Sequence, residues 1–171
     1  MRFGIVIFPQ QEVQEQANAL RMRYDSHYAL IAPHITLKEP FEVKEADLDK
    51  VTQAIEELVE KTPPFQLTIN KVGSFIPTSP VVFYGFEKNK EIVDLYEKLN
   101  EGILYQPTVH AFVPHITIAQ DLSEAELTDL YNRFKLHTFD IPVTADQVHL
   151  VYQTEDKTWK NYKSFSLKGK K

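Results

Sequence analysis

The sequence predicts an α+β protein of two pseudo-symmetric lobes, each an antiparallel sheet with helices on its outer face, which meet at a central cleft. Strand-like and helix-like segments alternate along the chain, and the order strand, helix, strand, helix, strand, strand occurs twice. The tetrad His-Ile-Thr-Leu at 34–37 returns 81 residues later as His-Ile-Thr-Ile at 115–118, each time directly after a proline. A duplicated unit explains these observations. We expect residues 1–171 to form one bilobal domain whose lobes share strands.

The composition sets the class of protein. The 171 residues, 43% hydrophobic and 25% charged, can bury a core without covalent staples. The absence of cysteine excludes a disulfide framework, a thiolate nucleophile and a zinc finger. No apolar stretch approaches the roughly 20 residues that span a bilayer, and the first apolar run is too short for a signal peptide. We therefore expect a cytoplasmic protein with no membrane partner, and the oligomeric state stays open.

The charge of the chain bears on nucleic-acid binding. A net charge of −5 disfavours a broad grip on a phosphate backbone, which needs clustered Lys and Arg. The one dense basic run, Lys-Gly-Lys-Lys at 168–171, is interpreted as a frayed terminus. We expect no extended nucleic-acid surface.

The first half of the chain reads as alternating strands and helices. Pro9 ends the first strand, and the first helix closes at the Asp25-Ser26 turn. Arg21 and Arg23 on that helix either form a solvated face or steer an anionic substrate. The predicted elements are a strand over 2–8, a helix over 11–24, the extended tetrad at 34–37, a helix over 47–61, a strand over 65–72 and a loop over 73–80.

The second half repeats this order. Ser123 and Glu126 are spaced as a capping box, which marks a helix N-terminus. The predicted elements are a strand over 81–86, a helix over 91–100, the tetrad at 115–118, a helix over 123–134, and strands around 139–143, 148–152 and 159–167.

The tetrads combine polar and apolar side chains with a period of two. In an extended segment His34 and Thr36 leave one face, while Ile35 and Leu37 leave the other. The apolar pair can pack on a core while the polar pair faces a cleft. The second tetrad follows the same pattern, with His115 and Thr117 on one face and Ile116 and Ile118 on the other.

Two such histidines suit phosphodiester hydrolysis. The attacking water must lose a proton while the leaving alkoxide gains one, so a neutral imidazole on one side and a protonated one on the other serve both needs. A threonine on the same face can donate to a non-bridging oxygen. The sequence has no metal-binding pattern, so we expect neither metal nor cofactor.

These motifs resemble a known family. The paired H-x-T-hydrophobic tetrads are similar to those of the 2H phosphoesterase superfamily, which includes the bacterial 2′-5′ RNA ligase/cyclic phosphodiesterase enzymes. Gly73-Ser74-Phe75 with Val-Val-Phe-Tyr-Gly at 81–85 resembles that family's G-x-F…V-h-aromatic-h-G strand pair. Segments 3–9 and 23–30 look most like the YjcG group of proposed phosphoesterases in Bacillus-type bacteria. The resemblance covers essentially the whole chain.

The resemblance implies roles for individual residues. His34 would be the proton donor and His115 the proton acceptor, with Thr36 and Thr117 binding phosphate. Many relatives carry an arginine just before the valine of the V-h-aromatic strand, where this chain has Thr78-Ser79-Pro80. This departure favours a small cyclic phosphate or nucleotide over a gripped RNA.

Three functions are compatible with the sequence. The first is a metal-independent phosphoesterase that hydrolyses a cyclic phosphodiester of the 2′,3′-cyclic nucleotide or RNA-end type. The second is a non-catalytic nucleotide- or phosphate-binding module that uses the same cleft. The third is a two-histidine metal site completed by a carboxylate such as Glu39. Among the other histidines, His110 and His149 are minor candidates for cleft residues, and His27 and His137 are expected in loops or at helix ends.

Overall fold

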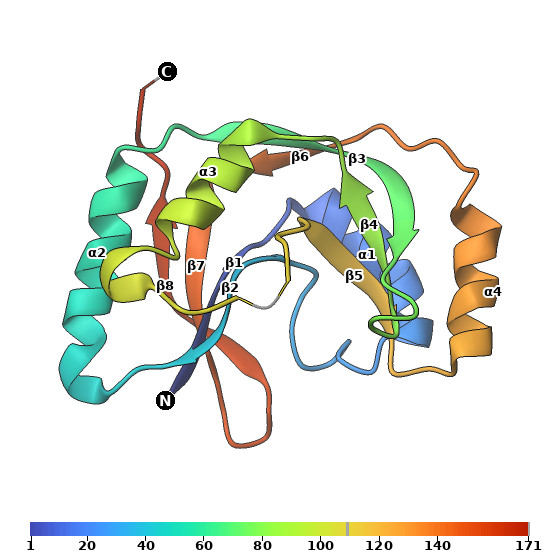
Figure 1. The fold of residues 1–171 in the computed structure, drawn as a ribbon, viewed down its shortest axis with the longest axis horizontal. Coiled ribbons are helices and arrows are strands. Elements are labelled where there is room, and N and C mark those ends of the chain that lie inside the picture. The colour runs from blue at the N-terminus through green and yellow to red at the C-terminus, as the bar shows by residue number, and fades with distance from the viewer. Residues whose placement is uncertain (109, 171) are drawn as a thin grey trace.

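The computed structural model describes residues 1–108 and 110–170 (Figure 1). Lys171, part of the basic terminal run, lies outside the described residues. These described residues form two four-stranded antiparallel sheets and four α-helices, which confirms the α+β prediction. In order, the elements are β1 (Arg2–Ile7), α1 (Gln11–Tyr24), β2 (Ile35–Glu42), η1 (Glu45–Asp47), α2 (Leu48–Glu60), β3 (Phe65–Ser74), β4 (Val81–Phe86), α3 (Lys90–Lys98), η2 (Gly102–Leu104), β5 (His115–Gln120), α4 (Glu124–Phe134), β6 (Ile141–Ala145), β7 (Gln147–Gln153) and β8 (Trp159–Ser166).

The two sheets have corresponding topologies and exchange strands. Their strand orders are β2-β1-β7-β8 and β5-β4-β3-β6, so each tetrad strand, β2 or β5, is the edge strand of its own sheet. After α2 the chain crosses to the other sheet, where β3 pairs with β4. After α4 the chain first adds β6 beside β3 and then crosses back, where β7 pairs with β1. Neither half of the sequence therefore builds a sheet alone.

The helices are distributed in the same reciprocal way. α1 follows β1 but packs against β5 of the other sheet, and α3 follows β4 but packs against β2. α2 lies against β8 and α4 against β3 and β4, which places these two helices at opposite ends of the molecule (Figure 1). No helix among residues 1–108 and 110–170 is long and apolar enough to cross a membrane.

A continuous hydrophobic core joins the two lobes. Buried side chains of both sheets and all four helices belong to one cluster, including Ile5 and Ile35 of one sheet and Ile116 and Val143 of the other. Such a shared core resists relative movement of the sheets, because close-packed interiors tolerate little displacement. The lobes therefore hold the tetrads in a fixed relation.

Some element boundaries differ from the sequence-based prediction. β3 continues through Gly73 and Ser74, which pair with Phe83 and Val82 of β4, so the predicted loop begins later. The strand predicted at 139–143 lies at 141–145, because Ile141 to Ala145 pair with β3 while Phe139 packs on the core. Ser123 caps α4 as predicted: its hydroxyl accepts from the Glu126 backbone N–H at 3.1 Å and donates to Glu126 Oε1 at 2.9 Å.

Candidate active site

The fold brings the two tetrads together. His34 directly precedes β2 and His115 opens β5, and these two edge strands contact each other in the centre of the molecule (Figure 1). The apolar tetrad residues are buried, with exposed fractions of 0–2%. The polar residues are half-buried and open toward the surface. The polar set is His34, Thr36, His115 and Thr117, and the buried set is Ile35, Leu37, Ile116 and Ile118.

Both tetrads contain a β-bulge at their fourth residue. Val6 pairs with Thr36 while Ile5 pairs with Lys38, which leaves Leu37 as the extra residue. In the other sheet Phe83 pairs with Thr117 and Val82 with Ala119, which leaves Ile118 as the extra residue. A bulge turns the following side chain to the other face. Lys38 and Ala119 are therefore buried, although strict alternation would place them beside the threonines.

Each tetrad histidine is oriented by the same hydrogen bond. Nδ1 of His34 lies 2.8 Å from the Ala32 carbonyl oxygen, and Nδ1 of His115 lies 2.7 Å from that of Val113. A carbonyl can only accept, so Nδ1 carries the proton and Nε2 of the neutral ring is the free basic nitrogen. The intervening prolines, Pro33 and Pro114, help to fix this geometry because a proline restricts both its own φ and the residue before it.

The surroundings of both rings favour the neutral imidazole. Burial lowers the pKa of His34 from 6.5 to about 4, and the hydrogen bond to Ala32 offsets this only in part. The charges of Arg21 and His115 lower the pKa of His34 further, which places the two histidines within electrostatic range of each other. Burial also lowers the pKa of His115, whereas the bond to Val113 and the charge of Glu39 raise it.

Aromatic rings cause much of this desolvation. Phe75 and Phe83 lie with ring centroids 5.0 and 5.3 Å from His115, and Phe8 lies 6.4 Å from His34. A Cβ on Gly73 would lie 2.6 Å from the Phe83 ring, so glycine is what lets that ring reach the histidine. The G-x-F and V-h-aromatic motifs thus build the wall beside His115. The sequence pattern contains these residues but does not predict this role.

A cavity of about 1120 Å³ opens beside the tetrads. Thr36 and His115 line it, so it contains one polar residue from each tetrad, but His34 and Thr117 are not in its wall. Aromatic side chains and hydroxyl groups make up much of the remainder. These are Phe75, Tyr96 and Phe112, and Ser74, Thr78, Ser79 and Thr108. Glu39 is its one acidic lining residue, and no Lys or Arg is among the described residues that line it.

The remaining histidines separate into two groups. His110 lines the cavity. His149 lies 5.0 Å from the Phe8 ring, and its Nδ1 lies 2.8 Å from the Ser164 hydroxyl. His27 is exposed and faces Asp121, and His137 packs beside Phe134 and Phe139. Phe8, placed between His34 and His149, is a site neighbour that the sequence did not reveal.

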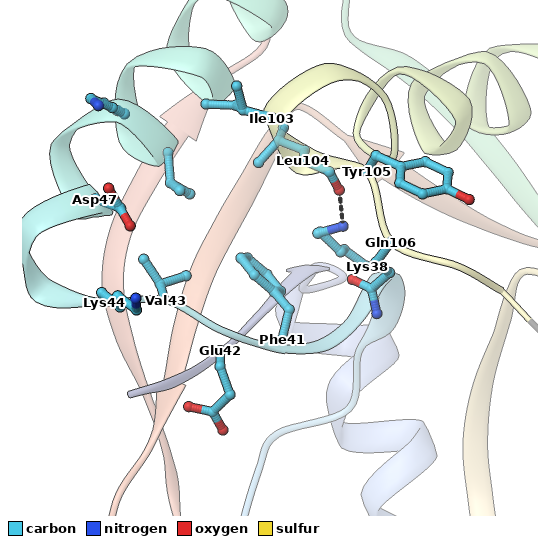
Figure 2. A pocket seen from close by; sticks show the side chains of 12 residues that line it. Lys38, Phe41, Glu42, Val43, Lys44, Asp47, Ile103, Leu104, Tyr105 and Gln106 are labelled. Carbon is cyan, nitrogen blue, oxygen red and sulfur yellow. Dashed lines mark hydrogen bonds between the residues drawn. The ribbon is translucent and has the colours of Figure 1, made fainter.

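A second cavity, of about 610 Å³, is lined by residues of β2, of the segment 43–51 and of the segment 103–106 (Figure 2). Lys38 reaches into its wall and donates to the Leu104 carbonyl and, at 3.1 Å, to Asn100 Oδ1. Gln106 lines both cavities, so the two cavities are neighbours. Among the residues that the structure describes, no three His, Asp or Glu side chains gather as a metal site would require, and Glu39 does not complete one.

The two edge strands that carry the proline-preceded H-x-T-h tetrads thus contact each other, as the resemblance to the 2H phosphoesterases implied. The chain belongs to the 2′-5′ RNA ligase superfamily, whose sequence profile matches residues 9–157. A Bacillus cytotoxicus protein named "Putative phosphoesterase" is 46% identical over 172 residues, covering 100% of both chains. A Bacillus mycoides protein with the same designation is 44% identical over 167 residues, covering 98% of this chain and 97% of its own.

Solved structures share the fold at low sequence identity. Escherichia coli LigT complexed with 3′-AMP superposes with a TM-score of 0.75 at 18% identity, covering 97% of each chain. The Thermus thermophilus protein TT0787 superposes with a TM-score of 0.74 at 19% identity, covering 100% of each chain. These comparisons establish the architecture of the chain.

Proposed function

We propose that this protein hydrolyses a cyclic phosphodiester by metal-independent acid–base catalysis with His34 and His115. Membership of the superfamily and the names of the relatives make the chain a phosphoesterase, a hydrolase that acts on ester bonds. The observation that carries the finer proposal is the matched pair of hydrogen bonds from Nδ1 to a carbonyl two residues upstream. Each bond leaves Nε2 free to exchange a proton.

The proposed reaction is one displacement at phosphorus. One neutral imidazole removes a proton from water as the new P–O bond forms, and the other, protonated, gives its proton to the ribose oxygen as the old P–O bond breaks. The Thr36 and Thr117 hydroxyls donate to the non-bridging oxygens, where charge develops. Residues 1–171 act as one bilobal unit in this proposal, because each tetrad contributes one half of the machinery.

The cavity supports a small nucleotide-type substrate. Its aromatic rings and neutral hydroxyl groups suit a nucleoside, and the lack of Lys and Arg among its described lining residues disfavours additional phosphates. LigT structures have been described with 3′-AMP, with NADP+ and with phosphate. We extend that ligand class to this chain and propose a 2′,3′-cyclic nucleotide or a cyclic RNA end.

Two considerations assign the acid and the base differently. The family resemblance implies His34 as donor and His115 as acceptor. Burial lowers the pKa of both rings, but the local charges differ. Glu39 raises the pKa of His115, whereas Arg21 lowers that of His34 more than Asp25 raises it, which favours protonation of His115 first. A p-nitrophenyl phosphodiester decides between them, because its leaving group needs no proton. The alanine variant of the acid should keep activity on this ester, and the alanine variant of the base should lose it.

The test of the function is turnover of 2′,3′-cyclic nucleotides in the presence of EDTA. We expect hydrolysis by the wild type and its loss in His34→Ala and His115→Ala, with the free energy of unfolding changed by no more than about 1 kcal/mol. The matched control is His137→Ala, an exposed histidine outside the cavity, which should remain active. Activity that requires Mn²⁺ or Mg²⁺ would contradict the metal-independent mechanism.

A non-catalytic binding module is the second candidate. The lowered pKa values leave both rings neutral in the free protein, and a ring without a proton is not yet an acid. If the protein is an enzyme, an anionic phosphate bound between the rings raises their pKa values, so that one ring takes up the proton it needs to act as the acid. Tight binding of a cyclic nucleotide by the wild type without any turnover would favour the module.

A further inference from the structure

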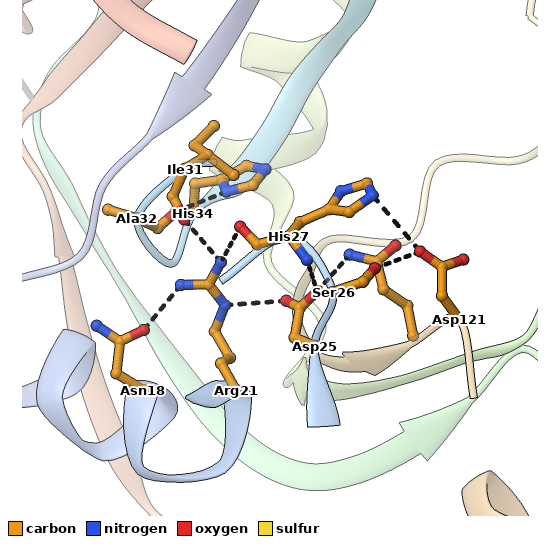
Figure 3. A network of polar contacts seen from close by, with 10 residues as sticks. Asn18, Arg21, Asp25, Ser26, His27, Ile31, Ala32, His34 and Asp121 are labelled. Atoms are coloured by element: carbon orange, nitrogen blue, oxygen red, sulfur yellow. Dashed lines mark hydrogen bonds and ion pairs between the residues drawn. The ribbon is translucent and has the colours of Figure 1, made fainter. Parts of the chain in front are cut away.

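An ion pair buried beneath the tetrads links their two segments. The Arg21 side chain is 2% exposed, which corrects the expectation of a solvated face, while Arg23 is exposed as expected. Nε of Arg21 lies 3.0 Å from Oδ2 of Asp25, and both side chains are buried (Figure 3). In the described part of the chain, the other ion pairs all join exposed side chains. Among the described residues, Arg21 and Asp25 therefore form the one buried ion pair.

Arg21 holds the segment that orients His34. Its guanidinium donates to Asn18 Oδ1 at 2.8 Å and to the Ile31 carbonyl at 2.7 Å. The next residue, Ala32, supplies the carbonyl that binds His34 Nδ1 (Figure 3). One guanidinium thus fixes the backbone directly before the first histidine against helix α1.

Asp25 holds the strand that carries the second histidine. Its Oδ1 accepts from Gln120 Nε2 at 2.8 Å and from the His27 backbone N–H at 2.8 Å. Asp25 and Gln120 also form an isolated parallel β-bridge. Gln120 ends β5, the strand that His115 opens. The two members of one ion pair are therefore bonded to the two tetrad segments.

The other half of the molecule contains a reciprocal contact. Asp25 directly follows α1, and Asn100 lies two residues after α3; Asn100 bonds the tetrad strand of the opposite sheet. Its Oδ1 accepts from Lys38 Nζ at 3.1 Å, and its Nδ2 lies 3.4 Å from the Leu37 carbonyl of β2. Each exchanged helix thus ends in a side chain that binds the other lobe's tetrad strand. This correspondence makes the Arg21–Asp25 arrangement part of the duplicated design.

We propose that Arg21 and Asp25, with Gln120, are positioning residues that set the orientation of His34 relative to His115. The inference rests on the proposed function, because it assigns these residues to the alignment of the acid–base pair. A buried ion pair adds little stability over apolar residues of equal volume, so stability alone does not account for this pair. Its bonds reach Ile31, just before the first tetrad, and Gln120, just after the second. Misplacement of a catalytic group by about 1 Å can cost about 100-fold in rate.

The test compares three variants with a matched control. Gln120→Ala removes only the side-chain bond by which β5 is held to Asp25. Arg21→Lys keeps the charge but lacks the planar fork that holds several acceptors at once. Gln66→Ala is the control, because Gln66 is exposed and bonds Thr144 across β3 and β6, away from the tetrads. Asp25→Asn removes the charge.

We expect kcat for a 2′,3′-cyclic nucleotide to fall about tenfold or more in Gln120→Ala and Arg21→Lys, with KM changed less than about twofold. Gln66→Ala should match the wild type. Asp25→Asn should lower kcat by a similar factor. If Asp25→Asn fails to fold, Gln120→Ala still tests the positioning role, because Gln120 is only half-buried. Unchanged kcat in both Gln120→Ala and Arg21→Lys would overturn the proposal.

A second measurement does not depend on turnover. Long-range ¹H–¹⁵N correlation spectra of the full chain report which ring nitrogen of His34 holds the proton. The Nδ1–H tautomer should dominate in the wild type and in Gln66→Ala, and Arg21→Lys should show a mixture of tautomers. If the wild type hydrolyses no cyclic phosphodiester, the proposed function fails, and these spectra alone decide the positioning role. An undisturbed Nδ1–H tautomer in Arg21→Lys would then overturn it.

Discussion

At the scale of single residues, the neighbours of the two histidines determine what the rings can do. Each ring is fixed through Nδ1 and desolvated by aromatic side chains, so before a phosphate binds each is neutral and has Nε2 available. The sequence could predict the histidines and threonines, because scarce residue types recur in one pattern. It could not predict Phe8 or the ring contacts of Phe75, since aromatic residues are equally common in any core.

Gly73 provides a test of the wall beside His115. In Gly73→Ala the new Cβ would lie 2.6 Å from the Phe83 ring and force it to move. We expect the variant to lose about 1–3 kcal/mol of unfolding free energy, as overpacking usually costs, and to lose activity because Phe83 shields His115. Urea denaturation and kcat/KM measure these effects.

The control for this prediction is Gly4→Ala. A Cβ on Gly4 would meet its nearest neighbour at 3.6 Å, an ordinary contact. This variant should stay within about 1 kcal/mol of the wild type. Equal losses in the two variants would show that the Phe83 contact is not the cause.

The desolvation of the half-buried His34 should make stability depend on pH. Its pKa is about 4 in the folded protein, against 6.5 for an unperturbed imidazole, so the unfolded chain binds more protons between these values. The free energy of unfolding should therefore rise with pH across that window and level off above it. Denaturation at several pH values should show a smaller slope for His34→Ala than for the wild type. Identical slopes would contradict burial as the cause of the lowered pKa.

At the scale of elements, the β-bulge after each threonine is the feature that sequence periodicity missed. The tetrad's alternation reads the same with or without a bulge, because only the pairing register of β1 with β2 reveals the extra residue. The bulge has a clear consequence for Lys38. It turns this side chain from the face of Thr36 into the interior, where Lys38 ties β2 to Asn100 and η2.

Lys38 therefore offers a prediction about the cavity wall. Lys38→Met keeps the volume but removes the bonds to Asn100 and Leu104, which hold the segment entering the larger cavity. We expect KM for a cyclic nucleotide to rise more than kcat falls. Lys44→Met is the control, because Lys44 is exposed and lines only the smaller cavity. A fall in kcat with KM unchanged would show that Lys38 acts on the histidines.

At the scale of the whole molecule, duplication explains the site. The sequence predicted two lobes, most element positions and the burial of the apolar tetrad residues, because these follow from repeated local patterns. It did not predict which strands and helices of one half pack in the other lobe. The pairing of β7 with β1 and the packing of α1 on β5 depend on contacts between distant segments. These exchanges, with the shared core and the Arg21–Asp25 pair, fix one tetrad relative to the other.

The central claim is that both tetrads act on one phosphate, and a double-mutant cycle tests it most directly. kcat/KM for a 2′,3′-cyclic nucleotide would be measured for the wild type, His34→Ala, His115→Ala and the double variant. When two groups act as one unit, removing either one abolishes the contribution of both. Each single variant should therefore lose about 10²–10⁴-fold in kcat/KM, and the double variant little more than either. Losses that multiply in the double variant, or a single variant that retains wild-type kcat/KM, would contradict a shared phosphate.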